Sequence, residues 1–282
     1  MISIAELTRG SGIDAIDARV LLRAALGVSD AHLIAHAGDE ISAQHEARFR
    51  AHAARRAAGE PIAYLVGERE FYGRAFALSP AVLIPRPETE LLVELALQRL
   101  PRNDPCRVLD LGTGSGCIAI SIALERSAAR VTATDRCEAA LDVARKNAQR
   151  LGAGNIEFRA GDWFSALKDE RFDVIVSNPP YVAVGDAHLV QGDLRFEPKA
   201  ALAAGADGLD CIRSIVAGAP VHLERGGSLW LEHGYDQSAR CRALFAAAGF
   251  TQVQSWRDIA AIERVTGGQH GTGAGMTRAK HV

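Results

Sequence analysis

From about residue 105 onward, short apolar runs alternate with helical segments, and this alternation constrains the fold more than any other feature. Strands that alternate with helices along a chain usually pair in parallel, with helices on both faces of the sheet. We therefore expect an α/β fold with a seven-stranded, mostly parallel sheet and right-handed crossovers. The predicted strands are 107–111, 129–134, 155–160, 172–177, 227–232, 250–256 and 261–266.

The rest of the chain divides around this α/β domain, which we expect to span residues 86–266. Residues 1–70 are rich in good helix formers, which predicts a small all-α domain. Residues 71–85 alternate aromatic and β-favouring side chains around a glycine and a Ser-Pro pair, so we expect a β-hairpin linker. Residues 267–282 are rich in glycine and polar side chains, which is typical of a disordered tail. The apolar positions at helical spacing in the first domain are Ala18, Leu21, Leu22, Ala25 and Leu26.

Composition narrows the possible partners. The formal net charge is −2 and the pI about 6.5, whereas tight non-specific binding to nucleic acid usually leaves a basic footprint. No apolar run reaches the ~18 residues of a membrane span, and the N-terminus lacks the pattern of a secretory signal. The five cysteines are odd in number and lack CxxC spacing. We therefore expect a cytoplasmic protein with no metal site, membrane contact or direct nucleic-acid partner.

One helical run in the first domain, AQHEARFRAHAARRAAG, has a basic face. A solvated helix face is the simpler interpretation of such a charge run. The alternative is a contact with an acidic partner. The arginines concerned are Arg48, Arg50, Arg55 and Arg56.

A glycine-rich segment, DLGTGSG, joins the first predicted strand of the α/β domain to the helix that follows. Glycines at such a turn let the backbone approach a ligand closely, and the helix N-terminus directs amide groups at it. The dinucleotide fingerprint GxGxxG would place a glycine at position 117, which is Cys117 here. GxGxG after an acidic strand end is the form used to bind S-adenosylmethionine, a methyl donor that is called the donor below. The alternative is that the glycines only form a tight structural turn. The candidate donor-binding residues are Gly112, Thr113, Gly114, Ser115 and Gly116.

Two further strand ends carry groups suited to an adenosine. Asp135 follows the glycines by about twenty residues, where a carboxylate can accept hydrogen bonds from both ribose hydroxyls. Asp162 and Trp163 end the next strand. The indole offers a flat contact for an adenine ring, and the aspartate offers an acceptor for its amino group. The alternatives are a solvated aspartate and a core tryptophan, but three successive strand ends together favour a donor site.

The strand 172–177 stops at Asn178-Pro179-Pro180-Tyr181, because two prolines cannot continue a buried strand. The carboxyl edge of an open α/β sheet is where ligands bind. The Asn178 Oδ1 and the Pro179 carbonyl can accept both N–H bonds of a planar nitrogen and hold its lone pair toward a sulfonium methyl. The prolines keep the loop rigid, and Tyr181 offers a face for the planar group. This predicts catalysis by orientation and electrostatics, without a strong general base.

The segment Pro85–Glu90, PRPETE, precedes a helical run and has a proline and acids where a helix begins. A helix start is therefore one interpretation. A rigid loop facing the ligand is the other, and the crowding of Arg86 between two prolines favours it.

Together these segments resemble the peptide chain release factor glutamine methyltransferases along nearly the whole chain. The resemblance is carried by PIAYLVGEREF (Pro61–Phe71), LIPRPETE (Leu83–Glu90), the DLGTGSG loop, NPPY and RFEPKAAL (Arg195–Leu202). It implies the class I methyltransferase fold, which is Rossmann-like, and N5-methylation of the glutamine in the Gly-Gly-Gln motif of class I release factors. S-adenosylmethionine would be the donor and S-adenosylhomocysteine the product.

The resemblance also assigns roles to residues. Gly112 to Gly116, Asp135 and Trp163 would bind the donor, and Asn178 to Tyr181 would hold the substrate glutamine. The N-terminal domain would help to dock the release factor. We expect a monomer.

Three alternatives remain open at this point. NPPY also serves methyltransferases that act on adenine or cytosine amino groups, but these need a basic target-recognition region. A sister enzyme acting on a ribosomal protein would be expected to differ in its N-terminal region. A donor-binding protein without catalysis would not need Asn178.

Members of this family usually end soon after a stretch like ERVT, which is Glu263–Thr266 here. This chain continues for sixteen more residues, and the extension begins Gly267-Gly268-Gln269. Coincidence in a glycine-rich tail is the favoured explanation for the match to Gly-Gly-Gln. The sharper hypothesis is that the tail enters its own active site as an inhibitor or a substrate.

Overall fold

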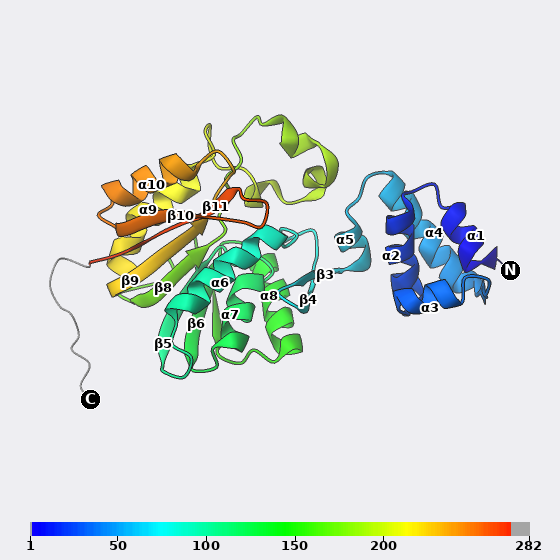
Figure 1. Cartoon of the computed structure of the whole chain (residues 1–282), viewed down its shortest axis with the longest axis horizontal. Helices are drawn as coiled ribbons and strands as arrows, with labels where there is room; N and C mark the ends of the chain where they lie inside the picture. The colour runs from blue at the N-terminus through cyan, green and yellow to red at the C-terminus, as the bar shows by residue number, and fades with distance from the viewer. Residues whose placement is uncertain (1, 272–282) are drawn as a thin grey trace.

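The computed structural model describes residues 2–271. A helical N-terminal domain stands beside the α/β domain, and a short helix and a hairpin connect the two (Figure 1). The expected fold class is confirmed, and several boundaries differ from the prediction as described below. Within residues 2–271, every helix is too short or too polar to cross a bilayer.

The N-terminal domain folds around the apolar positions that the sequence predicts. In α2, the Asp14 carboxylate accepts a hydrogen bond from the Ile16 N–H, and Gly27 ends the helix in the left-handed conformation. Leu21 and Leu22 are fully buried in the domain core. The elements are β1 (Ile2–Ser3), α1 (Ile4–Arg9), α2 (Ala15–Leu26), α3 (Asp30–Ala35), β2 (Glu40–Ile41), α4 (Ala43–Ala57) and α5 (Ile62–Val66).

The basic face of α4 is largely neutralised within the chain. Arg50 pairs with Glu46, and Arg55 pairs with Glu60. Arg56 lies 2.6 Å from Asp17 of α2 and also reaches the α/β domain. Three of the four arginines therefore have acidic partners in the protein itself, which supports the interpretation of a solvated and internally paired helix face.

The hairpin lies earlier in the chain than the predicted range of 71–85. It consists of β3 (Glu68–Phe71) and β4 (Arg74–Ala77), paired antiparallel. The two turn residues, Tyr72 and Gly73, have φ values of 52° and 70°. Positive φ at both central positions gives the turn a backbone twist that matches the right-handed twist of the two flanking strands. Residues 78–86 continue without a strand and lead to the cavity described below.

The central sheet has the predicted seven strands, in the order β10-β11-β9-β8-β5-β6-β7. The five strands from β9 to β7 pair in parallel, and β11 is antiparallel between β9 and β10. The strands are β5 (Cys106–Leu111), β6 (Ala129–Asp135), β7 (Ile156–Ala160), β8 (Phe172–Ser177), β9 (Leu223–Glu232), β10 (Thr251–Arg257) and β11 (Glu263–Gln269).

Helices cover both faces of this sheet (Figure 1). On β8, Val174 and Val176 pack with α6 and α7, whereas Ile175 packs with α9 and α10 on the other face. The helices are α6 (Glu90–Arg99), α7 (Cys117–Glu125), α8 (Glu138–Leu151), α9 (Asp210–His222) and α10 (Ser238–Ala247). Short 3-10 turns are η1 (Pro87–Thr89), η2 (Ala187–Val190), η3 (Gly192–Phe196) and η4 (Lys199–Ala201).

The strand register brings the predicted site segments to one edge. Leu111 of β5 is opposite Ser177 of β8, and Ser177 is opposite Leu231 of β9. On the other side, Asp135 of β6 is opposite Ala160 of β7. The residues that follow these positions therefore lie side by side. Because the chain turns from β5 toward β6 but later returns to β8, this edge is a topological switch point, where open α/β sheets bind ligands.

The prediction of a disordered tail is wrong for residues 267–269, because β11 continues through Gln269. A Cβ added to Gly267 would lie 2.3 Å from the Trp230 ring, and one added to Gly268 would lie 3.2 Å from Phe245. The two glycines therefore allow aromatic side chains to pack directly against the strand. Residues 272–282 of the predicted tail lie outside the described residues.

Candidate active site

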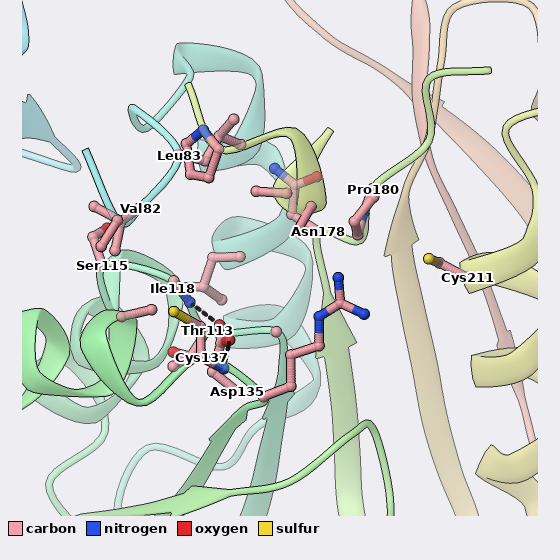
Figure 2. Close-up of a pocket in the computed structure, with 18 of the residues that line it drawn as sticks. Val82, Leu83, Thr113, Ser115, Ile118, Asp135, Cys137, Asn178, Pro180 and Cys211 are labelled. Carbon is pink, nitrogen blue, oxygen red and sulfur yellow. Dashed lines mark hydrogen bonds between the residues drawn. The ribbon is translucent and has the colours of Figure 1, made fainter. Parts of the chain in front are cut away.

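A cavity opens at the carboxyl edge of the sheet, and it gathers most of the predicted site residues. Figure 2 shows side chains of Asp135, Asn178 and Pro180 around it, together with Val82 and Leu83 from the segment after the hairpin. The predicted residues that line the cavity are Gly112, Thr113, Gly114, Ser115, Asp135, Asp162, Trp163, Asn178 and Pro180. Gly116, Pro179 and Tyr181 are not part of this lining.

The glycine loop needs its glycines for conformation and for close packing. Gly112, Gly114 and Gly116 all have positive φ, between 55° and 82°. A Cβ on Gly116 would lie 2.8 Å from Ile120 and 3.1 Å from Ala144. Gly116 therefore lets α7 approach α8 instead of lining the cavity itself, while α7 directs its N-terminus toward the loop.

Asp135 holds the glycine loop and still faces the cavity. Its Oδ2 accepts a hydrogen bond of 2.9 Å from the Gly114 N–H, and its Oδ1 accepts one of 2.9 Å from the Cys137 N–H. A carboxylate has about four acceptor positions. Each oxygen of Asp135 therefore keeps capacity to accept a further hydroxyl group at the position predicted for the ribose.

Asp110 lies beneath the loop and is completely buried. Its Oδ2 accepts a hydrogen bond of 2.7 Å from the Thr113 hydroxyl. Burial raises the pKa of Asp110 to about 7, although the Thr113 hydrogen bond opposes this shift. Asp110 therefore supports the loop from below and is not itself part of the cavity lining.

A buried asparagine ties the glycine loop to the hairpin, and sequence reasoning missed it. Asn147 of α8 donates hydrogen bonds to the carbonyls of Ser115 and Ala77, at 2.9 and 3.0 Å. Its Oδ1 accepts one of 2.8 Å from the Ala77 N–H. The only available signal was a polar residue at a core position of an amphipathic helix, and that signal does not identify the partners.

Trp163 forms a wall of the cavity beside the glycine loop. A Cβ on Gly112 would lie 3.5 Å from the Trp163 ring, so the indole packs directly against the loop backbone. Trp163 has a φ of 49°, which is uncommon for a residue that is not glycine. The neighbouring Asp162 is exposed and lines the same cavity. The predicted pairing of a flat surface with an acceptor is therefore present at this strand end.

Asn178 is oriented by a threonine that the sequence did not single out. Its Nδ2 donates a hydrogen bond of 3.1 Å to the Oγ1 of Thr89, and both residues line the cavity. Among the described residues, no hydrogen-bond donor reaches the Oδ1 of Asn178 or the carbonyl oxygen of Pro179. These are the two acceptors predicted to hold a planar nitrogen.

Tyr181 lies behind this arrangement. Its hydroxyl group donates a hydrogen bond of 3.2 Å to the Oε1 of Glu232, and its ring packs on the core between the sheet and α9. Burial and the nearby carboxylate of Glu232 raise the pKa of Tyr181 far above its usual value. The structure therefore places Tyr181 as a support for the NPPY loop, whereas the sequence predicted an open face for the substrate.

The LIPRPETE and RFEPKAAL segments meet through one buried acid. Glu197 accepts a hydrogen bond of 3.0 Å from the Ile84 N–H and forms an ion pair with Arg86. Leu83, Pro85 and Thr89 of the LIPRPETE segment line the cavity. The interpretation of this segment as a loop that faces the ligand fits this placement, and its last residues also begin η1 and α6.

Comparisons with known proteins show the family of this chain. A family model for the methyltransferase small domain matches residues 89–197, and one for the PrmC N-terminal domain matches residues 5–67. The release factor glutamine methyltransferase of Burkholderia pseudomallei is 57% identical over 272 residues, which cover 94% of this chain and 95% of that protein. That of Bordetella pertussis is 54% identical over 269 residues, which cover 95% and 99%. The chain belongs to the release factor glutamine methyltransferase family.

Solved structures support the fold of this methyltransferase. A methyltransferase from Pyrococcus furiosus has a TM-score of 0.54 at 19% identity, covering 77% of this chain and 97% of that one. A T. thermophilus 16S rRNA N2 G1207 methyltransferase, solved with AdoMet and guanosine, has a TM-score of 0.54 at 23% identity. The matched region covers 72% of this chain and 49% of the T. thermophilus chain. At these identities the likeness concerns the fold alone.

Proposed function

We propose that this methyltransferase methylates the side-chain amide nitrogen, N5, of the glutamine in the Gly-Gly-Gln motif of class I peptide chain release factors. S-adenosylmethionine is the donor, and S-adenosylhomocysteine is the product. The observation that carries the proposal is the orientation of Asn178, whose amide nitrogen donates to Thr89 while its Oδ1 accepts no hydrogen bond from the described residues. The names of relatives at 54% and 57% identity support the choice of substrate.

The cavity residues fit the donor. The backbone turn at Gly112 to Gly114 allows close approach of a ligand, and Asp135 has acceptor positions left for two ribose hydroxyls. Trp163 supplies a flat apolar wall for the adenine, and Asp162 an acceptor. When bound, S-adenosylmethionine supplies an activated methyl group on a sulfonium.

The NPPY loop overcomes the poor reactivity of an amide nitrogen by orientation. The two N–H bonds of the glutamine amide donate to the Oδ1 of Asn178 and the carbonyl of Pro179. Both acceptors favour the positive charge that develops on the nitrogen during transfer. The nitrogen loses a proton after the new N–C bond forms, so no strong general base is required. The rigid prolines keep the ordering cost low.

The proposal extends to the setting of the reaction. The release factor is the protein partner, the N-terminal domain helps to dock it, and the enzyme acts as a cytoplasmic monomer. Family membership favours a release factor over a ribosomal protein or nucleic acid. The unengaged Oδ1 of Asn178 favours an enzyme over a protein that only binds the donor.

Transfer of a labelled methyl group tests this proposal. Label is expected on a release factor that bears Gly-Gly-Gln, and not on its Gln→Ala variant or on DNA. Asn178→Ala should lower turnover about 10²-fold or more, with donor affinity largely intact, because the change removes an orienting acceptor. Label on DNA with the release factor untouched would overturn the proposal, and full activity of Asn178→Ala would refute the role of the amide.

A further inference from the structure

A buried carboxyl group lies directly behind the NPPY loop, outside the cavity. Glu232 ends β9, next to the strand that leads to Asn178, and only 1% of its surface is exposed. Burying a carboxylate is costly unless several hydrogen bonds compensate. Packing alone therefore does not explain why a glutamate occupies this position.

Glu232 lies beside two hydroxyl groups of the site, those of Tyr181 and Thr89. The Tyr181 hydroxyl donates to its Oε1 at 3.2 Å. The other carboxylate oxygen, Oε2, is buried and has no hydrogen-bond partner among the described residues, and the neighbouring Thr89 hydroxyl lowers the pKa of Glu232. The Oγ1 of Thr89 accepts the Asn178 Nδ2 hydrogen bond at 3.1 Å. Asn178, Thr89, Glu232 and Tyr181 therefore lie next to one another, and a Thr89 hydroxyl proton directed at the unpaired Oε2 would link them into one hydrogen-bond chain.

The direction of these hydrogen bonds selects the orientation of the Asn178 amide. A threonine hydroxyl has one proton and can either donate to an asparagine oxygen or accept from an asparagine nitrogen. An ionised Glu232 can only accept, so it attracts the Thr89 proton and leaves the lone pairs of Oγ1 facing Asn178. The Nδ2 of Asn178 then points at Thr89, and its Oδ1 is left for the substrate.

We propose that Glu232 is a positioning residue that acts through Thr89 to hold the Oδ1 of Asn178 toward the substrate amide. The same carboxylate holds Tyr181 and thereby the far end of the NPPY loop. This inference rests on the proposed function, because it assigns Asn178 the role of acceptor for the substrate nitrogen.

The protonation state of Glu232 determines whether the hydrogen bonds through Thr89 orient the Asn178 amide. Burial raises the pKa of Glu232 to about 7, while the hydroxyls of Thr89 and Tyr181 oppose the shift. The charged groups around it are Glu88 on η1, which raises the pKa, and Arg264 on β11, which lowers it. A protonated Glu232 can donate to Thr89, so the selection weakens as pH falls through about 7.

Steady-state kinetics on the full-length enzyme with a release factor tests the proposal through Thr89→Val and Glu232→Gln. We expect each change to lower kcat about 10- to 100-fold while the KM for the donor stays within about twofold. Thr89→Ser, which keeps the hydroxyl, should restore most of kcat. Because both residues act in one chain, the double variant should be no slower than the worse single variant.

The pH profile separates positioning from a merely structural role. In the wild-type enzyme kcat should rise with pH through about 7, and in Glu232→Gln this dependence should be lost. Thr132→Val, a buried change on β6 that does not line the cavity, is the matched control and should leave kcat unchanged. Unchanged kcat in Glu232→Gln, additive losses in the double variant, or a parallel loss of donor affinity and melting temperature would overturn the inference.

The amide orientation is also measured without a substrate. The side-chain ¹⁵N resonance of Asn178 should shift with pH through about 7 in the wild-type protein and not in Glu232→Gln. An insensitive resonance would contradict the inference. Failure of the wild-type protein to methylate a release factor would instead contradict the proposed function, so the two failures are distinguishable.

Discussion

At the scale of single residues, the proposed site of the methyl donor contains a side chain that also holds the backbone of the glycine loop. Asp135 accepts one backbone N–H on each carboxylate oxygen, from Gly114 and from Cys137. Both partners are donors, so neither position tolerates an amide NH₂ group in place of an oxygen. The carboxylate therefore holds the glycine loop, and we propose that it also binds a ribose.

Asp135→Asn should weaken donor binding by at least about tenfold, because charge-assisted hydrogen bonds contribute roughly 1.5–3 kcal/mol. Isothermal titration calorimetry with S-adenosylhomocysteine measures this. Asp142→Asn, an exposed acid on α8 outside the cavity, is the matched control and should bind like the wild-type protein. Equal affinity in Asp135→Asn and the control would show that the carboxylate does not contact the ligand.

The residues that the sequence revealed are those whose type alone restricts the backbone or the chemistry. The sequence alone predicts a site at glycines in a strand-to-helix turn, at two prolines after a strand, and at an acid at the next strand end. It does not reveal Thr89 and Glu232, because their proposed roles depend on the register that places β9 beside β8 and on the turn that brings Thr89 of η1 to Asn178. A threonine in a helix start and a glutamate at a strand end have ordinary explanations until their partners are known.

At the scale of elements, β11 is where composition misled the prediction. Glycine and polar residues are typical of a flexible tail, and Gly267-Gly268-Gln269 reads as one. In the fold the strand lies between β9 and β10, and its glycines make room for Trp230 and Phe245. Gln269 is 9% exposed. The match to Gly-Gly-Gln is therefore explained by packing, and the described strand is not positioned to enter the active site.

Two truncations test this explanation. A chain that ends at Gly271 should keep its melting temperature and turnover, since β11 is complete. A chain that ends at Thr266 should lose more than about 3 kcal/mol of unfolding free energy, because it uncovers Trp230 and removes the end of β11, which pairs with the middle of β9 and the start of β10. Urea unfolding measures both. Equal stability of the two chains, or methylation of Gln269 in the intact protein, would contradict the structural role.

At the scale of the whole molecule, the N-terminal domain contacts residues 193–195, just before the lining residues of the cavity between 198 and 203. Arg56 of α4 lies 3.2 Å from Asp193, and Arg195 donates a hydrogen bond of 2.6 Å to the Ala58 carbonyl. The Tyr64 hydroxyl donates one of 2.7 Å to the Val82 carbonyl, beside the cavity. The domain proposed to dock the release factor is therefore joined to the walls of the site.

Gly59→Ala should disturb this junction. Gly59 has a φ of 96°, and a Cβ there would lie 1.8 Å from the Arg195 guanidinium. We expect the KM for the release factor to rise severalfold while donor affinity is unchanged, as measured by steady-state kinetics and calorimetry. Gly38→Ala is the control, since a Cβ at Gly38 meets no atom within 4 Å. The same KM in both variants would show that the junction does not contribute to docking.

The most direct test of the account is tandem mass spectrometry of a release factor after incubation with the enzyme and S-adenosylmethionine. The account predicts one added methyl group on the side-chain nitrogen of the glutamine in Gly-Gly-Gln, with Asn178→Ala leaving that peptide largely unmodified. A methyl group on another residue, or an unmodified Gly-Gly-Gln peptide after incubation with the wild-type enzyme, would contradict it.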